Sequence, residues 1–165
     1  MKTAQPIPVF DEALAAQVEA LARKIWPEHY TPIIGEAQVA YMLEKFQTQK
    51  ALLEQINEGY FYYLIQNNEK TAIGYLAVQP REAELFLSKL YLLKETRGKG
   101  LSRFLLEWLK SFAQNRGLSK ITLTVHKLNP SVEIYQKLGF QITGPVVTDI
   151  GNGFMMDDYQ MEWVL

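Results

Sequence analysis

The sequence predicts an α/β protein built on a mixed, mostly antiparallel sheet. Two neighbouring runs, 60–66 and 71–79, are rich in aromatic and β-branched residues, and the short segment NNEK between them is typical of a hairpin loop. Two further strand-like runs, 83–93 and 120–126, are separated by a helical pattern. A β–α–β connection of this kind requires parallel pairing inside a sheet otherwise made of hairpins.

Length and composition predict a single domain, 1–165. The chain has 165 residues, 48% of them hydrophobic, which is enough for one sizeable core. Its 17 basic and 18 acidic residues leave a net charge of −1, so we expect neither nucleic acid nor a membrane as partner. With no cysteine and two histidines, we expect no metal site, thiol nucleophile or disulfide. The N-terminus has no apolar core of a signal peptide, and no segment approaches the roughly 18 apolar residues of a membrane span, so the expected localisation is cytoplasmic.

Helices are predicted to dominate the N-terminal part. A short strand at 6–10 is followed by an amphipathic helix for which Asp11 is the expected N-cap. The prolines of WPEHYTPIIG, 26–35, predict that this helix is interrupted there. A second helix spans 39–46 and either extends or is followed by a third helix up to Ile56.

A glycine-rich corner precedes the crossover helix. The segment RGKGLS, 97–102, places two glycines and two cations before a helix that begins near Leu101 and ends at Gly117. Glycine is an ordinary way to turn a corner, and on this corner alone a plain helix start is favoured. The first N–H groups of a helix also attract anions, and Gly98 and Gly100 would let a phosphate approach the backbone. Neither a dinucleotide fingerprint nor a P-loop pattern is present.

A second motif lies about 30 residues downstream, in NPSVEIYQKLGF. Asn129 is the expected N-cap of a short helix, with Pro130 in its first position and Gly139 after its end. Tyr135 then lies about 1.7 turns into this helix, at 3.6 residues per turn. The closing strand pair is predicted at 140–148 and 154–165.

Together the two motifs resemble those of the GNAT acyl-CoA-dependent N-acetyltransferases. The pattern R/Q-x-x-G-x-G/A is matched by Arg97, Gly100 and Ser102. The pattern N-x-x-A-x-x-x-Y-x-x-x-G-F is matched by Asn129, Tyr135, Gly139 and Phe140. Ser102 replaces the last small residue of the first pattern, and Val132 replaces the alanine of the second. The resemblance covers about 61–165. The ending DIGNGFMMDDYQMEWVL also resembles a bacterial branch that includes polyamine acetyltransferases of the PaiA type.

The resemblance implies the GNAT fold, a mixed sheet with helices on both faces, and an acetyl-CoA site between two splayed parallel strands. The backbone that would pair with the pantetheine arm is that of Leu90, Tyr91 and Leu92. The corner that would bind the pyrophosphate consists of Arg97, Gly98, Lys99, Gly100, Leu101 and Ser102. Asn129 would contact the cofactor arm, and Tyr135 would face the sulfur.

The chemistry of acetyl transfer requires a neutral amine. An ammonium with a pKa of about 10.4 is neutral in only ~1 part in 10³ at pH 7, so a base or a water chain is useful. Glu84 lies at the spacing from Arg97 at which several GNAT enzymes carry a catalytic glutamate, and the alternative is a solvated glutamate at a strand end. Tyr135 is the expected acid, although transfer from its phenol to a thiolate runs uphill by ~2 kcal/mol, so hydrogen bonding is the safer role. The alternative for Tyr135 is packing on the sheet.

Three other groups of residues have a functional and a structural interpretation. His126 ends a strand and would contact substrate or relay a proton, but a structural histidine is favoured. Trp26, His29 and Tyr30 would either line an acceptor pocket or pack in the core and loops. Four acidic residues near the C-terminus would suit a polycationic substrate, but a solvated surface is the favoured interpretation; they are Asp149, Asp157, Asp158 and Glu162.

The sequence therefore predicts acetyl-CoA-dependent N-acetylation of a small primary amine by direct attack in a ternary complex. A polyamine-like acceptor is expected ahead of a protein N-terminus or lysine, and the absence of cysteine excludes a cysteinyl acyl-enzyme. One alternative is a catalytically silent acyl-CoA-binding sensor or interaction module with the same fold. Another is a nucleotide-binding α/β protein. A homodimer is left open.

Overall fold

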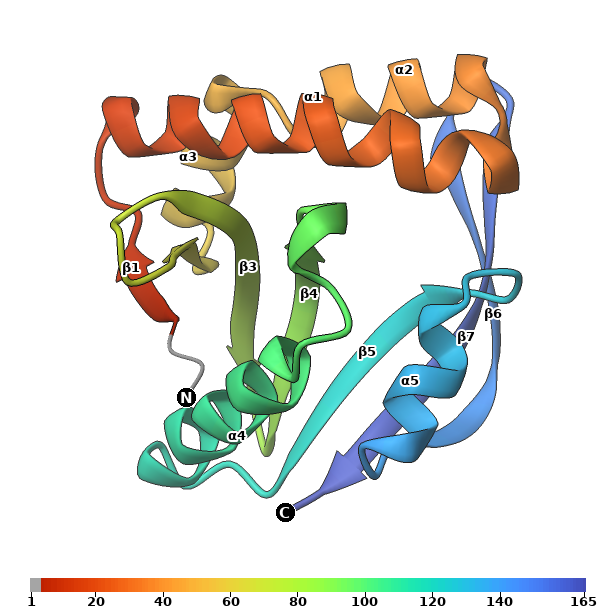
Figure 1. Cartoon of the computed structure of the whole chain (residues 1–165). Coiled ribbons are helices and arrows are strands. Elements are labelled where there is room, and N and C mark those ends of the chain that lie inside the picture. Colours follow the sequence, from red (N-terminus) through yellow and green to blue (C-terminus); the bar gives the residue numbers. More distant parts are fainter. Residues whose placement is uncertain (1–3) are drawn as a thin grey trace. The chain divides into compact units, whose positions relative to one another are not determined.

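A computed structural model describes residues 4–165 of the chain (Figure 1). The chain divides into two compact units. Unit 1 contains the residues up to Gln79 together with Lys89–Leu105, and unit 2 contains Pro80–Ser88 together with Leu106–Leu165. The prediction of one domain, 1–165, stays a prediction.

The elements of the described residues, 4–165, are seven strands and five α-helices. They are β1 (Gln5–Pro8), α1 (Glu12–Ile34), α2 (Glu36–Phe46), α3 (Gln49–Asn57), β2 (Phe61–Gln66), β3 (Ala72–Arg81), β4 (Glu84–Leu92), α4 (Leu101–Asn115), β5 (Lys120–His126), α5 (Ser131–Lys137), β6 (Gln141–Gly151) and β7 (Phe154–Val164). The strand order is β1-β2-β3-β4-β5-β7-β6. The pairs β1–β2, β2–β3, β5–β7 and β6–β7 are antiparallel, whereas β4–β5 is parallel. The predicted mixed, mostly antiparallel sheet is confirmed.

Helix α1 continues through both of its prolines, so the predicted interruption at 26–35 is wrong. A proline removes an N–H donor and costs about 3 kcal/mol in a helix interior. Pro27 and Pro32 are exposed, while Trp26 and Tyr30 on the same stretch are buried. Burial of large apolar side chains stabilises by roughly 1.5–3 kcal/mol each, which offsets the cost of the prolines. The helix ends at Gly35, where φ is 86°.

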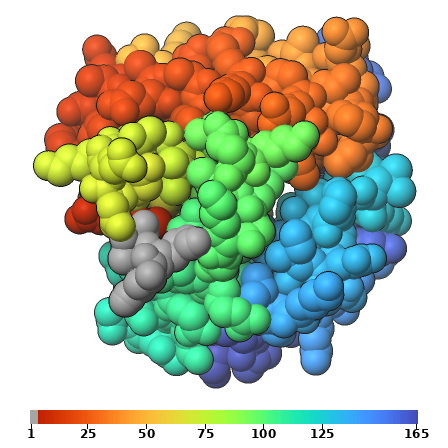
Figure 2. Space-filling view, viewed as in Figure 1, coloured from red at the N-terminus to blue at the C-terminus, as the bar shows by residue number. Residues whose placement is uncertain are grey.

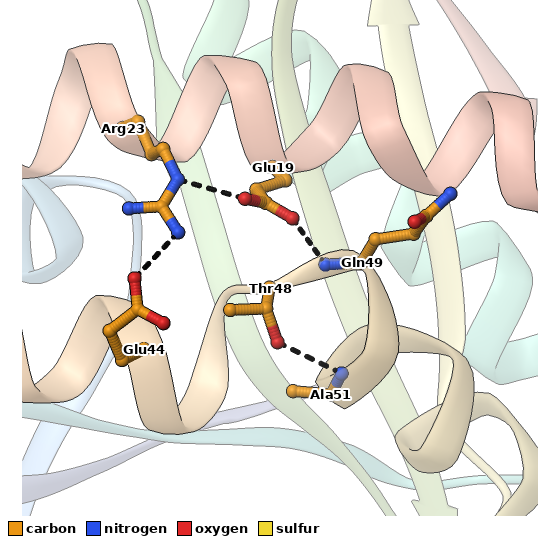
Figure 3. Close-up of polar contacts among 6 residues, drawn as sticks. All are labelled: Glu19, Arg23, Glu44, Thr48, Gln49 and Ala51. Carbon is orange, nitrogen blue, oxygen red and sulfur yellow. Dashed lines mark hydrogen bonds and ion pairs between the residues drawn. The ribbon is translucent and has the colours of Figure 1, made fainter.

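A polar network joins the three N-terminal helices of unit 1 (Figure 3). The Arg23 guanidinium donates to Glu19 Oε2 on α1 and to Glu44 Oε1 on α2, both at 2.8 Å. The other oxygen of Glu19, Oε1, accepts the backbone N–H of Gln49 at 2.6 Å, at the start of α3. Thr48 caps α3 through its hydroxyl oxygen. The alternative of a separate third helix is therefore confirmed.

A buried lysine fixes β4 within unit 1. Lys89 Nζ donates to the Phe46 carbonyl oxygen at 3.1 Å, to Gln55 Oε1 at 3.2 Å and to the Tyr62 hydroxyl. These three acceptors lie on α2, α3 and β2. Burial lowers the pKa of Lys89 to about 7. Because Lys89 directly precedes Leu90, this network positions the strand segment that the sequence assigns to the pantetheine arm.

The sheet of unit 2 has two unlike faces, because side chains alternate along a strand. On β5, Ile121, Leu123 and Val125 are buried and face the same side. They lie opposite Trp163, Met161 and Tyr159 of β7 in the strand register. The intervening positions carry polar side chains, namely Lys120, Thr122, Thr124 and His126 on β5. We call these the apolar face and the polar face of unit 2.

Candidate functional site

The corner of unit 1 has the backbone geometry of an anion site. Gly98 and Gly100 have φ of 73° and 81°, in the left-handed region that only glycine adopts without strain. A Cβ added at either glycine would meet no atom within 4 Å. Gly100 is the last residue before α4, because its carbonyl oxygen accepts the Phe104 N–H at 3.1 Å. The N–H groups of the first helical turn after it have no intrahelical acceptor.

The corner is open to solvent. Residues 97–100 are exposed, and this part of the chain, in green, lies on the visible surface in Figure 2. Arg97 is held back toward the strand, because its Nε donates to the Leu92 carbonyl oxygen at 3.1 Å. An exposed pair of glycines beside a helix N-terminus and two cations fits a pyrophosphate, whose oxygens accept N–H groups and whose charge favours cations.

Leu90, Tyr91 and Leu92 form the last part of β4 in unit 1. The β4–β5 ladder covers Glu84–Phe86 only, so these three residues lie beyond it. The hydroxyl of Tyr91 lies 3.2 Å from that of Tyr30 on α1. This contact ties the proposed cofactor strand to the first helix.

The aromatic residues around Tyr91 are mainly core. The Trp26 Nε1–H donates to the Tyr75 hydroxyl at 3.1 Å, which donates to Gln47 Oε1 at 2.8 Å. Trp26, Tyr30 and Tyr75 are buried, and burial raises the pKa of Tyr75. Packing in the core of unit 1, the alternative left open for Trp26 and Tyr30, is therefore favoured over an acceptor pocket.

Asn129 lies two residues before Ser131, the first residue of α5, so the N-cap position is Pro130 and not, as predicted, Asn129. Asn129 Oδ1 accepts the Ser131 N–H at 2.9 Å, and its own N–H donates to the His126 carbonyl oxygen at 2.9 Å. Asn129 is buried, at 5% exposure. These two hydrogen bonds of Asn129 connect the end of β5 to the start of α5.

Tyr135 lies on the apolar face of unit 2. Its ring centroid is 5.4 Å from that of Phe140, which is 5.7 Å from that of Trp163 on β7. Trp163 lies opposite Ile121, whose side chain belongs to the apolar face. Tyr135 is half-buried, so its ring is supported by this stack.

Glu84 lies at the other end of β5 from Asn129. Its partner in the parallel ladder is Lys120, the first residue of β5, and its carboxylate accepts a hydrogen bond from Thr122. The six steps from Lys120 to His126 span about 20 Å, at roughly 3.3 Å per residue. Unit 2 therefore does not bring Glu84 together with Asn129. The catalytic role of Glu84 stays a prediction.

Sequence reasoning missed the distinct environment of one acidic residue near the C-terminus. Three of the four acids have local partners: Asp149 accepts the Gly151 N–H, Asp157 pairs with Lys127, and Glu162 pairs with Lys120. Asp158 instead is buried, and its Oδ1 has no hydrogen-bond partner within residues 4–165. The one signal in the sequence was its place in the middle of a strand-like run.

Comparison with known proteins identifies the family. The family model of the acetyltransferase (GNAT) domain matches residues 30–163. Human N-acetyltransferase 8B is 28% identical over 142 residues, which cover 82% of this chain and 59% of that protein, so the chain spans less than two thirds of this relative.

Two solved structures share the fold. The PaiA N-acetyltransferase from Thermoplasma acidophilum, in complex with coenzyme A, has a TM-score of 0.81 at 20% identity and covers 99% of both chains. A chimera of the spermidine N-acetyltransferase SpeG from Vibrio cholerae and hSSAT has a TM-score of 0.70 at 18% identity, covering 99% of this chain and 95% of that one. No helix within residues 4–165 is long and apolar enough to cross a membrane. The match of the family model over most of the chain, together with this fold, means that the chain belongs to the GNAT acetyltransferase family.

Proposed function

We propose that the protein transfers the acetyl group of acetyl-CoA to a primary amine of a small molecule. The observation that carries this proposal is the exposed corner, in which two glycines with positive φ open the N-terminus of α4. Such a corner binds a pyrophosphate through backbone N–H groups, with Arg97 and Lys99 adding positive charge. Acetyl-CoA would be the co-substrate.

The other proposed residues act along the cofactor arm. Leu90, Tyr91 and Leu92 offer backbone groups to the pantetheine amides, and Asn129 contacts the arm from the start of α5. Tyr135 donates a hydrogen bond to the developing thiolate.

A polyamine-like molecule is the proposed acceptor. The fold is shared with a PaiA N-acetyltransferase and with a spermidine N-acetyltransferase chimera, which supports a small aliphatic amine. The amine attacks the thioester directly in a ternary complex, because a chain without cysteine has no thiol for an acyl-enzyme. We place this activity in the cytoplasm. The small-molecule amine is the proposed partner, and a homodimer is the oligomeric state to test.

The test measures release of free thiol from acetyl-CoA over a panel of amines. We expect turnover with spermidine or a similar diamine, and slower turnover with amino acids, aminoglycosides and peptides. Mass spectrometry of the product should show one added acetyl group. Coenzyme A binding without turnover on any amine would instead identify a catalytically silent module.

A further inference from the structure

Asp158 is a buried carboxylate with one oxygen that has no hydrogen-bond partner among the described residues. It is 7% exposed, and its Oδ1 is buried with no hydrogen-bond partner within residues 4–165. Burying an unpaired polar oxygen is costly, and for an ionised carboxylate the cost is larger still. Such atoms are rare in folded proteins and call for a specific explanation. A bound cation would remove the cost.

The register places Asp158 on the polar face of unit 2. It lies directly opposite His126 of β5 and Val146 of β6. Cβ atoms of directly opposed residues are about 5 Å apart, so Asp158 and His126 share a face. The backbone carbonyl of His126 accepts the N–H of Asn129. Asp158 thus lies opposite the residue whose carbonyl binds Asn129, at the end of β5 away from Glu84.

This placement sets Asp158 and Tyr135 on opposite faces of the same sheet. Tyr135 stacks through Phe140 on Trp163, on the apolar face. Acyl transfer proceeds through a tetrahedral adduct that carries both the amine nitrogen and the thioester sulfur. A proton acceptor and a proton donor would therefore act on different atoms of this adduct, Asp158 on the nitrogen and Tyr135 on the sulfur.

The surrounding charges leave Asp158 without a cation from its own unit. Asp157, its neighbour on β7, carries the same charge and pairs with Lys127 at 3.1 Å. His126 Nδ1 accepts the Leu128 N–H at 3.1 Å, so its ring proton lies on Nε2, and burial lowers the pKa of His126. Burial thus favours the neutral ring. On β6 the opposed residue, Val146, is apolar.

We propose that Asp158 binds the ammonium group of the acceptor amine and takes its proton, an inference that rests on the proposed acetyltransfer. One ammonium N–H bond breaks and a carboxylic acid O–H bond forms at Asp158. The freed lone pair then forms a C–N bond with the thioester carbonyl carbon, and the C–S bond breaks. The amide nitrogen loses a second proton, which the departing thiolate takes up. Asp158 returns its own proton to solvent, so the net products are the amide, coenzyme A thiol and one proton.

The basicity of Asp158 suits this role. Burial, and secondarily the charge of Asp157, raise the pKa of Asp158 to about 6. Relative to an ordinary aspartate, whose pKa is about 3.9, its carboxylate holds a proton about 100-fold more tightly. At pH 7.5 it is still ionised and ready to accept one.

The decisive variant is Asp158→Asn, with Asp149→Asn as matched control at an exposed aspartate of β6. Loss of a general base typically costs 10²- to 10⁴-fold in rate. We expect kcat/KM for spermidine at pH 7 to fall at least 100-fold in D158N and less than threefold in D149N. Coenzyme A binding should be unchanged in both. The D158N deficit should shrink toward pH 9.5, because more of the free amine is then already neutral.

Folding of D158N is checked by its urea midpoint. A carboxylate with a raised pKa in the folded state destabilises the fold as pH rises from about 4 to about 6. The neutral asparagine removes this penalty, so D158N should have a higher midpoint than wild type at pH 8 and a similar midpoint at pH 4.

The outcomes separate this inference from the proposed function. If wild type acetylates spermidine and D158N matches its rate and pH profile, Asp158 is not the proton acceptor although acetyltransfer stands. If wild type acetylates no amine, the proposed function fails, and ammonium binding is then decided by NMR titration of the Asp158 carboxyl group. Spermidine added with coenzyme A should lower that pKa, because a bound cation favours the ionised form. An unchanged pKa overturns the inference.

Discussion

Gly100 has two separate reasons to be a glycine, namely its backbone conformation and the space that a bound anion needs. A φ of 81° disfavours any residue with a Cβ, and the space around the missing side chain is empty within the protein. A substitution there therefore combines backbone strain with an obstacle to a bound anion. Gly117, at the other end of α4, has a φ of 71° and equally empty space, so it carries the strain alone.

Gly100→Val should lose coenzyme A binding by at least 30-fold, because the new side chain fills the place of the pyrophosphate. Gly117→Val should bind coenzyme A within threefold of wild type. Both variants should lose similar stability, about 1–2 kcal/mol, from the strained φ. Isothermal titration calorimetry and urea unfolding measure the two effects. Equal coenzyme A affinities of the two variants would show that the corner does not bind the pyrophosphate.

Which residues the sequence predicts correctly depends on how local their roles are. The start of α5 was predicted to within one residue, because the signals of Asn129 and Pro130 are local: the N-cap is Pro130 rather than Asn129, and Asn129 Oδ1 accepts the Ser131 N–H. The position of Glu84 depends on the register of β4 with β5, which couples residues 36 apart in sequence. The burial of Asp158 likewise depends on packing around β7. A pattern of acids in the sequence does not distinguish a solvated carboxylate from a buried one.

At the scale of elements, strands and helices were predicted correctly where the hydrophobic periodicity and the local turn or cap residues indicated the same element. Helix α1 is the exception, because its two prolines signal a break while its buried aromatic face continues. Proline acts through one missing hydrogen bond and a local clash, whereas burial of Trp26 and Tyr30 depends on β strands distant in sequence. The free energy gained by burying these side chains exceeds the local cost of the prolines. Helix α1 therefore forms in spite of its prolines, and replacing an exposed proline should increase its stability.

Pro32→Ala should stabilise the protein. Pro32 is exposed in the last turns of α1, so alanine adds a backbone N–H donor without changing the core. We expect the free energy of unfolding to rise by about 1–2 kcal/mol, less than the roughly 3 kcal/mol propensity difference because proline also restricts the unfolded chain. Urea unfolding measures the change. Glu28→Ala, at an exposed site of the same helix, is the control and should change stability by under ~0.5 kcal/mol. A decrease in stability of P32A would show that the helix requires the proline.

At the scale of the whole molecule, the two units share elements rather than being joined by a linker. Strand β4 contributes Glu84–Ser88 to unit 2 and Lys89–Leu92 to unit 1, and α4 is divided at Leu105. One unit cannot unfold completely without breaking a strand and a helix that also belong to the other. The prediction of a single domain is therefore a prediction that the two units unfold together.

The two units should therefore unfold in one transition. Trp26 reports on unit 1 and Trp163 on unit 2. Two variants that each keep one of these tryptophans, with the others replaced by phenylalanine, should each give a tryptophan-fluorescence midpoint in urea that equals the far-UV circular dichroism midpoint of the same protein. Acetyl-CoA at about 100 times its Kd should raise the stability of both by about 2.7 kcal/mol, since a ligand of the folded state stabilises the whole cooperative unit. A fluorescence transition displaced from the dichroism transition of the same variant, or an acetyl-CoA effect on only one reporter, would instead show two independently folding parts.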